Sequence, residues 1–465
     1  SVESPAYRYC ILACTCLLTF GSYYCFDMPT ILEKQIESQV IASWAPKQSS
    51  LFYNLFYTVY AWTNCAMSLC AGVLVDRIGT RRSCFLFVSL CLVGQTVFAM
   101  GAFMTGISGK SRYAVMFIGR FIFGLGGGSI TIVQNAITAH WFKNKELAMA
   151  FGITLTMSRL GSVINYDLTT LVYNGFDKHT NYGLGWTFLF GSFLIALSLV
   201  AAMVFVSLDV RAEKERGAGS KFIGRKIRFR DVSKFGVCYW CAALTIMAVY
   251  NIVFPFQAIV KGYFASGIWP SLAHNKEAAS VRASILYTIG MVVSPFLGIG
   301  IDILGRRGWL ALFGTAITVP AFLSFALAKG HVDPAFPMTL LGIAYSVCAA
   351  ALWPSIPLLV NMDSIGTANG VATSLQMIGI GICTIIVGQL KDSAGYTGVI
   401  WFLVGWCVAA TLFAALLIFF DRKDMKLYMS KKEREQARRK AEVVIDDPEV
   451  QPLLDGIEAE ESHTT

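Results

Sequence analysis

The chain has 465 residues, of which 55% are hydrophobic and 14% are charged, and its formal net charge is +9. Because soluble domains usually carry about 25% charged residues, this composition excludes an ordinary soluble domain. The basic residues stand beside long apolar segments, which favours cytosolic loops of a membrane protein over a nucleic-acid-binding surface.

Apolar segments long enough to span a membrane recur along the chain. A span needs about 20 apolar residues, because the hydrocarbon core is about 30 Å thick and a helix rises about 1.5 Å per residue. We therefore predict an all-α integral membrane protein with twelve transmembrane helices, at 9–29, 50–74, 83–104, 113–135, 148–172, 185–208, 235–258, 281–303, 308–329, 335–360, 367–390 and 397–420.

The predicted spans fall into two groups of six. Residues 1–210 hold the first six, 211–234 form a basic linker, 235–420 hold the last six, and 421–465 form a polar tail that we expect to be disordered. Lys and Arg are concentrated in the linker, at the start of the tail and in alternate links between spans. Since cytosolic loops are enriched in Lys and Arg, we expect both termini in the cytosol.

Two short polar links repeat one pattern. The link after the second span reads GVLVDRIGTRR, residues 72–82, and the link after the eighth reads GIGIDILGRR, residues 298–307. Matched links in the two halves indicate a duplicated six-helix unit, as in parallel-repeat transporters. Gly79 and Gly305 supply turn conformations that other residues avoid. The charged residues of the links either latch the halves in one state or only fix topology, and we predict conformational gating by Asp76, Arg77, Arg81, Asp302 and Arg306.

The chain resembles the major facilitator superfamily over residues 8–420. The resemblance rests on the two links, on GRFIFGLGGG in the fourth span and on IGTANGVATSLQMIGIGICTIIVGQLKDSAGY around the eleventh. Within that superfamily, GSYYCFDMPTIL, WFKNKELAMAFG and MSRLGSVIN resemble the group called major facilitator superfamily domain-containing protein 1. The resemblance implies two pseudo-symmetric halves, a lysosomal carrier exporting dipeptides to the cytosol, and a glycosylated lysosomal membrane protein as accessory subunit.

Arg159 is the strongest candidate for substrate binding. It lies in the middle of the fifth span, and ionisable residues inside spans mark functional sites by default. Its guanidinium suits a bidentate pair with a substrate carboxylate, although a structural ion pair within the bundle would also account for it. The resemblance favours carboxylate binding. Lys261, after VFPFQAIV in the seventh span, also matches the group and either attracts a carboxylate or marks the lumenal end of its helix.

An acidic partner for a substrate amine is harder to find. The related group typically reads GGES where this chain reads GGGS, so Gly128 replaces an acid suited to pairing with a peptide's amino group. Asp27, in CFDMP near the lumenal end of the first span, is the nearest alternative acid, or else only a charge at a helix end. Since few acids lie in the middle of spans, we expect facilitated transport without proton coupling.

The remaining candidates would line the substrate cavity or take part in the conformational change. Arg120 opens RFIFGLGGG in the fourth span and either couples the conformational change or extends its charge to the membrane surface. Asn135 either completes a hydrogen-bonding lining or joins helices. Tyr250 and Trp353 would wall a cavity for apolar side chains, although large aromatic residues also fill ordinary helix bundles.

The polar segments contain a predicted sorting signal but no catalytic or cofactor-binding motif. They hold no metal-ligand cluster, no cofactor motif and no nucleophile with a base, so we expect neither an enzyme nor a cofactor. In the tail, EVQPLL fits the acidic dileucine pattern that adaptor complexes read for lysosomal delivery, with Glu449, Leu453 and Leu454 as its defining residues. The alternatives to a dipeptide carrier are a carrier of another small organic anion or amino acid, and a non-transporting solute sensor of the same fold.

Overall fold

The structure is a computed structural model that describes residues 5–142, 147–180, 182–216, 229–273, 275–328, 331–360, 365–422, 425, 427–429 and 433. These residues form helices and short turns, without strands. The long helices are α1 (Pro5–Ile31), α3 (Ser49–Ile78), α4 (Thr80–Phe103), α5 (Gly109–Phe142), α6 (Leu147–His179), α7 (Gly183–Arg216), α8 (Val237–Phe264), α10 (Lys276–Leu304), α11 (Arg307–Leu327), α12 (Ala335–Leu352) and α14 (Ile365–Asp421). The short ones are α2 (Glu33–Ile36), η1 (Glu37–Ile41), η2 (Pro46–Gln48), η3 (Phe229–Lys234), α9 (Pro270–Ala273), η4 (Trp353–Ser355) and α13 (Ile356–Leu359).

The long helices account for the twelve expected spans. Within the described ranges, eight helices are long and apolar enough to cross a membrane. The helices α3, α6 and α10 are not among those eight, but with 30, 33 and 29 residues they are long enough to span. The long helix α14 holds two expected spans, because Gly395 has a φ of +66° and interrupts it. The prediction of an all-α, multi-pass membrane protein is confirmed.

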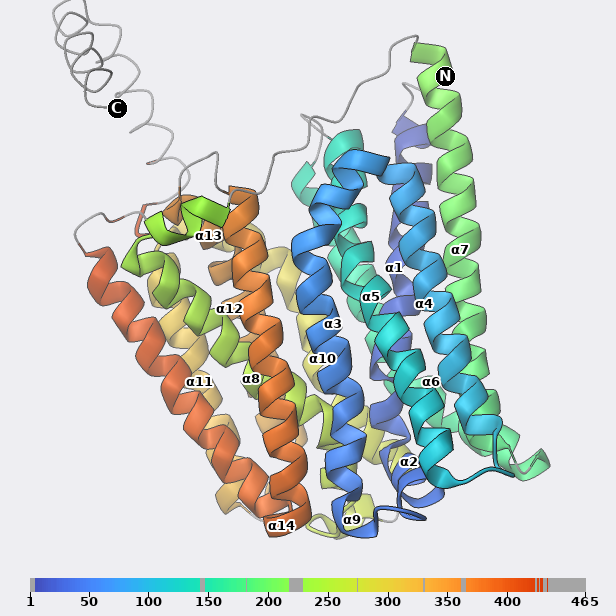
Figure 1. The fold of residues 1–465 in the computed structure, drawn as a ribbon. Helices are drawn as coiled ribbons and strands as arrows, with labels where there is room; N and C mark the ends of the chain where they lie inside the picture. The colour runs from blue at the N-terminus through green and yellow to red at the C-terminus, as the bar shows by residue number, and fades with distance from the viewer. Residues whose placement is uncertain are drawn as a thin grey trace, which may run out of the picture.

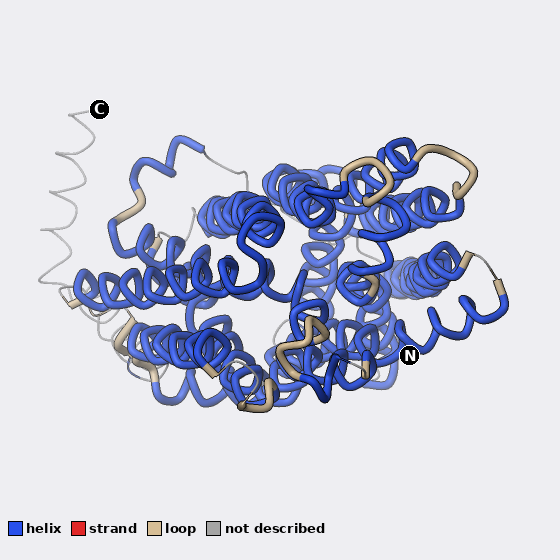
Figure 2. The backbone as a smooth tube through the Cα atoms, turned by 90° about the horizontal axis from the view of Figure 1, so that it is seen from below, coloured by secondary structure: helices blue, strands red, loops and turns tan. Residues whose placement is uncertain are grey.

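The helices run side by side between two ends of the molecule. In Figure 1, the C-terminal end of α7 and the short helix α13 lie at the top of the molecule, which we call the linker end. The short helices α2 and α9 lie at the bottom, which we call the far end. Seen along the helices in Figure 2, the bundle is elongated, with two groups that meet at its centre. The helices α1 to α7 form the N-terminal half, and α8 to α14 form the C-terminal half.

The halves meet mainly through two helix pairs, α3 with α14 and α6 with α10, and α8 also contacts α1 and α2. On α3, the described hydrogen bonds to the other half involve residues between Ser50 and Cys65, which is the part nearer the far end. Glycines on α14 permit this approach, because a Cβ on Gly388 would lie 2.8 Å from the Leu51 Cα and one on Gly381 only 2.1 Å from the Trp62 Nε1. The structure is therefore tightly packed between the halves toward the far end.

The turns of the repeated links have the predicted conformation. Gly79 has a φ of +84° and Gly305 a φ of +66°, a region that side chains other than glycine rarely adopt. A Cβ on Gly79 would meet no atom within 4 Å, so backbone conformation rather than crowding requires glycine there. Gly395, in the GQLKDSAGY segment that follows the eleventh span, has the same φ as Gly305. Equivalent turns thus recur in the two halves.

Candidate functional site

Arg159 lies half-buried on α6, against the C-terminal half. Its Cζ lies 5.2 Å from the centre of the Tyr345 ring on α12, which is a cation–π contact. A Cβ added to Gly290 on α10 would lie 2.2 Å from its Nη1, so the guanidinium reaches the α10 backbone. The Nη1 atom is buried and has no hydrogen-bond partner among the residues that the structure describes. A positive group with unused donor capacity therefore stands between the halves, which is what an anion site requires.

Aromatic side chains extend from Arg159 into the C-terminal half. The ring centres of Tyr345 and Tyr250 are 5.6 Å apart, and the Trp353 Nε1 donates a hydrogen bond of 2.9 Å to the Tyr250 hydroxyl. Tyr250 also stacks on Phe254 at 5.5 Å. The structure thus connects three predicted residues, Arg159, Tyr250 and Trp353, through Tyr345. Tyr345 was not predicted, although it stands about two helical turns before Trp353, a spacing that places both on one helix face.

Asp27 is a second ionisable group between the halves. It lies on α1 and is only 2% exposed. Its Oδ1 accepts a hydrogen bond of 3.2 Å from the Tyr287 hydroxyl on α10, and its Oδ2 is buried without a hydrogen-bond partner in the described part of the chain. The tyrosine in turn packs against Tyr166 on α6, with ring centres 5.9 Å apart. Asp27 is therefore an acid that faces the other half with hydrogen-bonding capacity to spare.

Arg120 does not extend to the membrane surface, because it is only 1% exposed. The rings of Phe26, Tyr57, Tyr60, Phe98 and Phe123 lie within 6.0 Å of its Cζ. Its Nη1 donates to the Cys25 carbonyl at 3.2 Å, and its Nη2 donates to the next carbonyl along α1. The Cys25 carbonyl has no helical partner because Pro29, four residues later, lacks an N–H. Arg120 thus holds α1 near its proline, two residues from Asp27.

Lys261 and Asn135 lie apart from the Arg159 group. The Lys261 Nζ donates to the Ile31 carbonyl at 2.8 Å and to the Thr170 hydroxyl at 2.9 Å, so it ties α8 to α1 and α6 nearer the far end. Asn135 is exposed on α5, and the described contacts do not connect it with Arg159. Of the predicted substrate residues, the structure therefore groups three around Tyr345 and places Asp27 and Lys261 at other inter-half contacts.

The described gating candidates pair within their own halves. Arg81 binds Asp209 and Glu213 on α7, the latter at 2.7 Å. Arg306 adopts a φ of +50°, and its Cζ lies 5.2 Å from the Tyr428 ring centre. Neither contact crosses between the halves in this state. Several predicted side chains lie outside the described part of the structure: Asp76, Arg77, Asp302, Glu449, Leu453 and Leu454.

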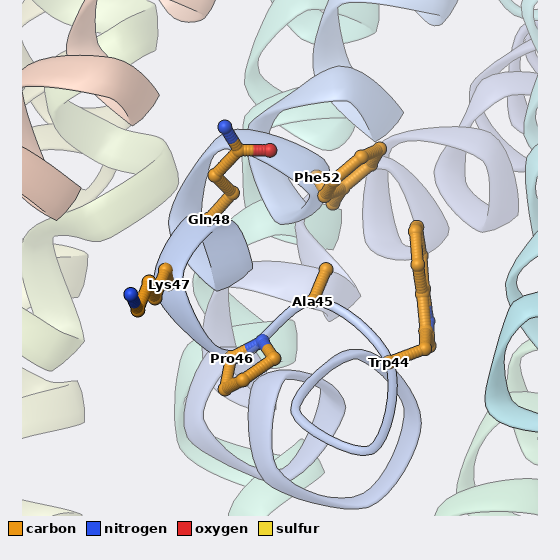
Figure 3. A pocket seen from close by; sticks show the side chains of 6 residues that line it. All are labelled: Trp44, Ala45, Pro46, Lys47, Gln48 and Phe52. Atoms are coloured by element: carbon orange, nitrogen blue, oxygen red, sulfur yellow. The ribbon is translucent and has the colours of Figure 1, made fainter.

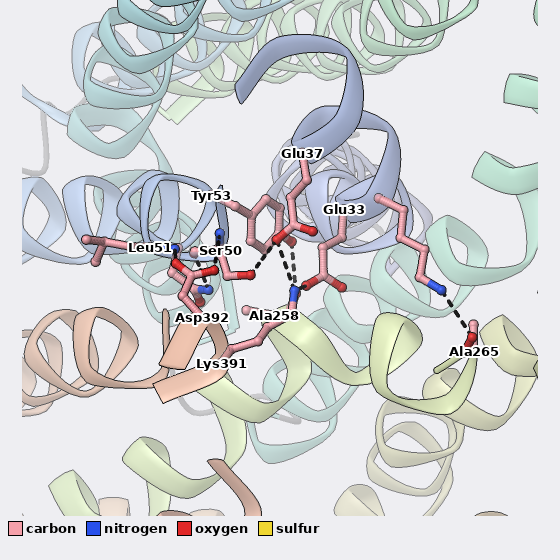
Figure 4. A network of polar contacts seen from close by, with 11 residues as sticks. Glu33, Glu37, Ser50, Leu51, Tyr53, Ala258, Ala265, Lys391 and Asp392 are labelled. Atoms are coloured by element: carbon pink, nitrogen blue, oxygen red, sulfur yellow. Dashed lines mark hydrogen bonds and ion pairs between the residues drawn. The ribbon is translucent and has the colours of Figure 1, made fainter. Parts of the chain in front are cut away.

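An ionic cluster that the sequence did not predict closes the far end (Figure 4). The Lys391 Nζ on α14 donates to the Glu33 Oε1 on α2 and, at 3.0 Å, to the Glu37 Oε1 on η1. The carboxylate of Asp392 accepts the backbone N–H groups of Ser50 at 3.0 Å and Leu51 at 2.8 Å, at the start of α3. Adjacent residues of the C-terminal half thus hold two separate elements of the N-terminal half.

The position of the replaced acid is filled by an amide. A Cβ on Gly128 would lie 1.7 Å from the Asn64 Oδ1, so the Asn64 side chain occupies the space in which a longer residue at 128 would stand. The Nδ2 of Asn64 lies 3.6 Å from the Met377 sulfur on α14. A neutral group therefore faces the other half here.

The surface grooves do not coincide with the Arg159 group. A groove of about 450 Å³ at the far end is lined by the side chains drawn in Figure 3, namely Trp44, Ala45, Pro46, Lys47, Gln48 and Phe52. A second, of about 350 Å³, lies between α3 and α5 beside the exposed rings of Trp62 and Phe121. Neither contains a residue predicted to bind substrate, and the second is apolar enough to face lipid.

Comparison with known proteins agrees with this architecture. A family model described as Major Facilitator Superfamily matches residues 11–384. The Lysosomal dipeptide transporter MFSD1 of Homo sapiens is 31% identical over 442 residues, covering 93% of this chain and 90% of that protein. Its Danio rerio namesake is 32% identical over 421 residues, covering 89% of this chain and 87% of that protein. The crystal structure of a D-xylose-proton symporter superposes with a TM-score of 0.67 at 15% identity, covering 88% of this chain and 97% of its own. That last likeness concerns the fold alone.

Proposed function

The chain belongs to the major facilitator superfamily, whose members are transporters and not enzymes, and we propose that it carries dipeptides across the lysosomal membrane. The relatives described as lysosomal dipeptide transporters match almost the whole chain, which supports this substrate and this membrane.

The observation that carries the proposal is the unpartnered Nη1 of Arg159. A buried N–H without a partner costs about 1–3 kcal/mol, so a site that keeps one gains from a ligand that satisfies it. A carboxylate offers two oxygens in the geometry of the guanidinium fork. Arg159 would hold the peptide's carboxylate, and the rings of Tyr345, Tyr250 and Trp353 would contact its side chains. Such a wall tolerates many apolar side chains because it fixes no hydrogen bond to them.

A dipeptide also carries an amino group, and Asp27 supplies the opposite charge. Its Oδ2 is buried and unpartnered on the same inter-half surface. An ammonium there would gain a charge-assisted hydrogen bond. A zwitterion with separated ends fits a site whose cation and acid come from α6 and α1. Asn135 and Lys261 remain proposed contributors to the lining and to substrate entry.

The inter-half contacts favour alternating access, with the far end closed in this state. Their concentration toward the far end supports access from the linker end. We assign the linker end to the cytosol, which places both termini there, and the far end to the lumen. The few acids inside the spans favour uniport, and a uniporter would export dipeptides whenever they are more concentrated in the lumen than in the cytosol. Residues 1–210 and 235–420 would move as the two halves, with 211–234 as the connecting linker and 421–465 as a cytosolic tail.

Delivery and protection of the carrier complete the proposal. Glu449, Leu453 and Leu454 would recruit adaptor complexes, and a glycosylated lysosomal membrane protein would serve as accessory subunit. The charged residues of the links, Asp76, Arg77, Arg81, Asp302 and Arg306, would bind different partners when the linker end closes. Arg120 would take part by holding the proline-containing part of α1.

A second candidate substrate follows from the space at Gly128. Because Asn64 fills it with a neutral amide, amine recognition depends on Asp27 alone. If Asp27 does not serve this role, the site selects carboxylates without an amine, as in a carrier of another small organic anion. A sensor of the same fold would bind the same ligands without moving them.

Ligand-induced thermal stabilisation separates these candidates. A ligand that binds the folded protein raises its unfolding midpoint by mass action. The purified protein would be tested with dipeptides, N-acetylated dipeptides, amino acids and monocarboxylates, followed by uptake into proteoliposomes. Stabilisation and flux with free dipeptides, both lost on acetylation, support the proposal. Equal stabilisation by the acetylated forms would transfer it to organic anions, and binding without flux would identify a sensor.

A further inference from the structure

The far-end ionic cluster holds more negative than positive charge. Lys391 donates to both Glu33 and Glu37, so two carboxylates share one ammonium. Glu33 is only 2% exposed, and the Lys391 side chain only 10%. Like charges that share a buried site cannot both ionise without cost, because little water screens them. A single added proton would leave one carboxylate paired with the ammonium and remove the excess charge.

The Oε2 atom of Glu33 is the atom that can bind this proton. It is buried, and none of the described residues forms a hydrogen bond with it. That oxygen lies against α8, since a Cβ on Gly262 would lie 2.2 Å from it and 2.6 Å from the hydroxyl of Tyr396. The phenol of Tyr396 on α14 therefore stands beside the Oε2. A proton on the Oε2 would therefore have a neutral hydroxyl as a neighbour and would displace no existing hydrogen bond among the described residues.

Apart from Tyr396, whose ring centre lies 5.3 Å from the Lys391 Nζ, the charged or titratable groups that the structure describes around Glu33 already make hydrogen bonds. Lys34, its neighbour on α2, is exposed and donates to the Ala265 carbonyl at 3.1 Å. Tyr53 on α3 donates to the Ala258 carbonyl at 2.8 Å. Asp392 is bound to the start of α3, where two N–H groups and the helix dipole stabilise its charge. Lys34 is the cation among these groups, and because it is exposed to water its charge is screened, so most of the excess negative charge remains with Glu33 and Glu37.

We propose that Glu33, Glu37 and Lys391 form a proton-binding site that couples acidity at the far end to its closure. The cluster joins the halves, so the site exists only while the far end is closed. Opening separates Lys391 on α14 from both carboxylates and exposes them to water. The closed form consequently binds the proton more tightly than the open form, and acid stabilises closure by mass action.

The direction of the pH effect follows from the two environments of Glu33. In the closed form, burial raises the pKa of Glu33 to about 7, with Lys391 lowering it and Glu37 raising it further. In water a glutamate has a pKa of about 4.3. The stabilisation of the closed form is thus fully present below the ordinary pKa and is lost as pH rises through about 7. A compartment with an acidic lumen at the far end would favour the closed state of the empty carrier.

The test measures closure directly. Spin labels introduced as non-canonical amino acids at Lys47 and Ser266, which are exposed at the far end of opposite halves, report the inter-half distance in proteoliposomes. In the wild-type protein the ratio of short to long distances should rise about 60-fold between about pH 7.5 and about pH 5, as a pKa of about 7 in the closed form and about 4.3 in the open form requires. Glu33→Gln, which keeps an oxygen for Lys391 but not the excess charge, should show a high and pH-independent closed population. If that variant fails to fold, Glu37→Gln removes the same charge from a more exposed position.

The matched control is Asp333→Asn, which neutralises an acid at the same end that pairs with Arg282 inside the C-terminal half. It should retain the wild-type pH response. A pH-independent wild-type distance, or a response unchanged in both Glu variants, overturns the inference. Its physiological meaning rests on the proposed lumenal placement of the far end, but its test does not rest on dipeptide transport. Dipeptide flux with pH-independent closure would refute only this inference, whereas pH-dependent closure without dipeptide flux would refute only the proposed substrate.

Discussion

Replacing Arg159 by Met should abolish dipeptide binding without weakening the fold. The change removes a buried Nη1 that has no partner, which relieves about 1–3 kcal/mol. It also removes the cation–π contact with Tyr345, worth about 0.5–2 kcal/mol, but a thioether beside the same ring returns about 0.3–1.5 kcal/mol. The free energy of unfolding of the ligand-free protein should therefore stay the same or rise by about 1 kcal/mol.

Dipeptide affinity, in contrast to stability, should fall in the Arg159→Met protein. A carboxylate held by the guanidinium makes two charge-assisted hydrogen bonds, worth about 1.5–3 kcal/mol each. Their loss corresponds to a decrease in affinity of at least about 100-fold, since 1.4 kcal/mol is about tenfold. The assay is the unfolding midpoint with and without dipeptide, followed by uptake in proteoliposomes. The Arg159→Met protein should melt at or above the wild-type midpoint, gain nothing from dipeptide, and show no flux.

Arg112→Met is the matched control. Arg112 is also buried, at 6% exposure, but donates to the carbonyls of Gln39 at 2.8 Å and Ala102 at 3.0 Å. Removing it leaves the buried Ala102 carbonyl and the part-buried Gln39 carbonyl without these donors, so the midpoint of this variant should fall. An equal fall in Arg159→Met would show that Arg159 is a structural residue. Wild-type dipeptide flux in Arg159→Met would refute the carboxylate site outright.

Three further changes test neighbouring parts of the reasoning. Gly290→Ala would place a methyl group 2.2 Å from the Arg159 Nη1, so the guanidinium must move. Dipeptide affinity should then fall about tenfold in the thermal assay. Unchanged affinity would mean that the exact position of Arg159 does not affect binding. Asp392→Ala removes a helix cap that joins the halves and should cost about 0.5–2 kcal/mol of stability in the ligand-free protein; an unchanged midpoint would show that the cap does not stabilise this state. Changing Leu453 and Leu454 to Ala should move the protein to the plasma membrane under the microscope, and lysosomal retention would point to another signal.

The features that could be predicted from the sequence are local. A span is recognised from about 20 successive residues, and the glycines of the links announce their turns because few other residues accept a positive φ. Gly79 and Gly305 therefore have the predicted conformation. Arg159 could be singled out because a charge in the middle of an apolar segment is costly wherever the segment packs.

Features that join distant segments could not be predicted in this way. Glu33 and Lys391 are 358 residues apart, and nothing around either residue specifies the other. Arg120 looked like a charge near a helix end because its partners are backbone carbonyls, which have no sequence signature. Its buried position depends on the backbone carbonyl of Cys25, which lacks its helical partner because of Pro29 and accepts a hydrogen bond from Arg120. Packing between helices, and not composition, determines where these side chains lie and which groups they bind.

The same packing distinguishes the roles of the two cationic residues proposed to meet a carboxylate. On the α6–α10 pair, the Thr170 and Ser280 hydroxyls meet at 3.3 Å near the far end, and Arg159 meets Gly290 about 15 Å further along, at 1.5 Å per residue. Opening the far end by alternating access would separate the first contact most and the second least. A substrate must be held in both states, so its fixed anchor belongs near the pivot. Lys261, which bonds to Thr170, would separate from it with the gate. Its charge would then be exposed to arriving carboxylates at the moment of opening, which suits substrate entry, whereas Arg159 would retain the ligand through the exchange.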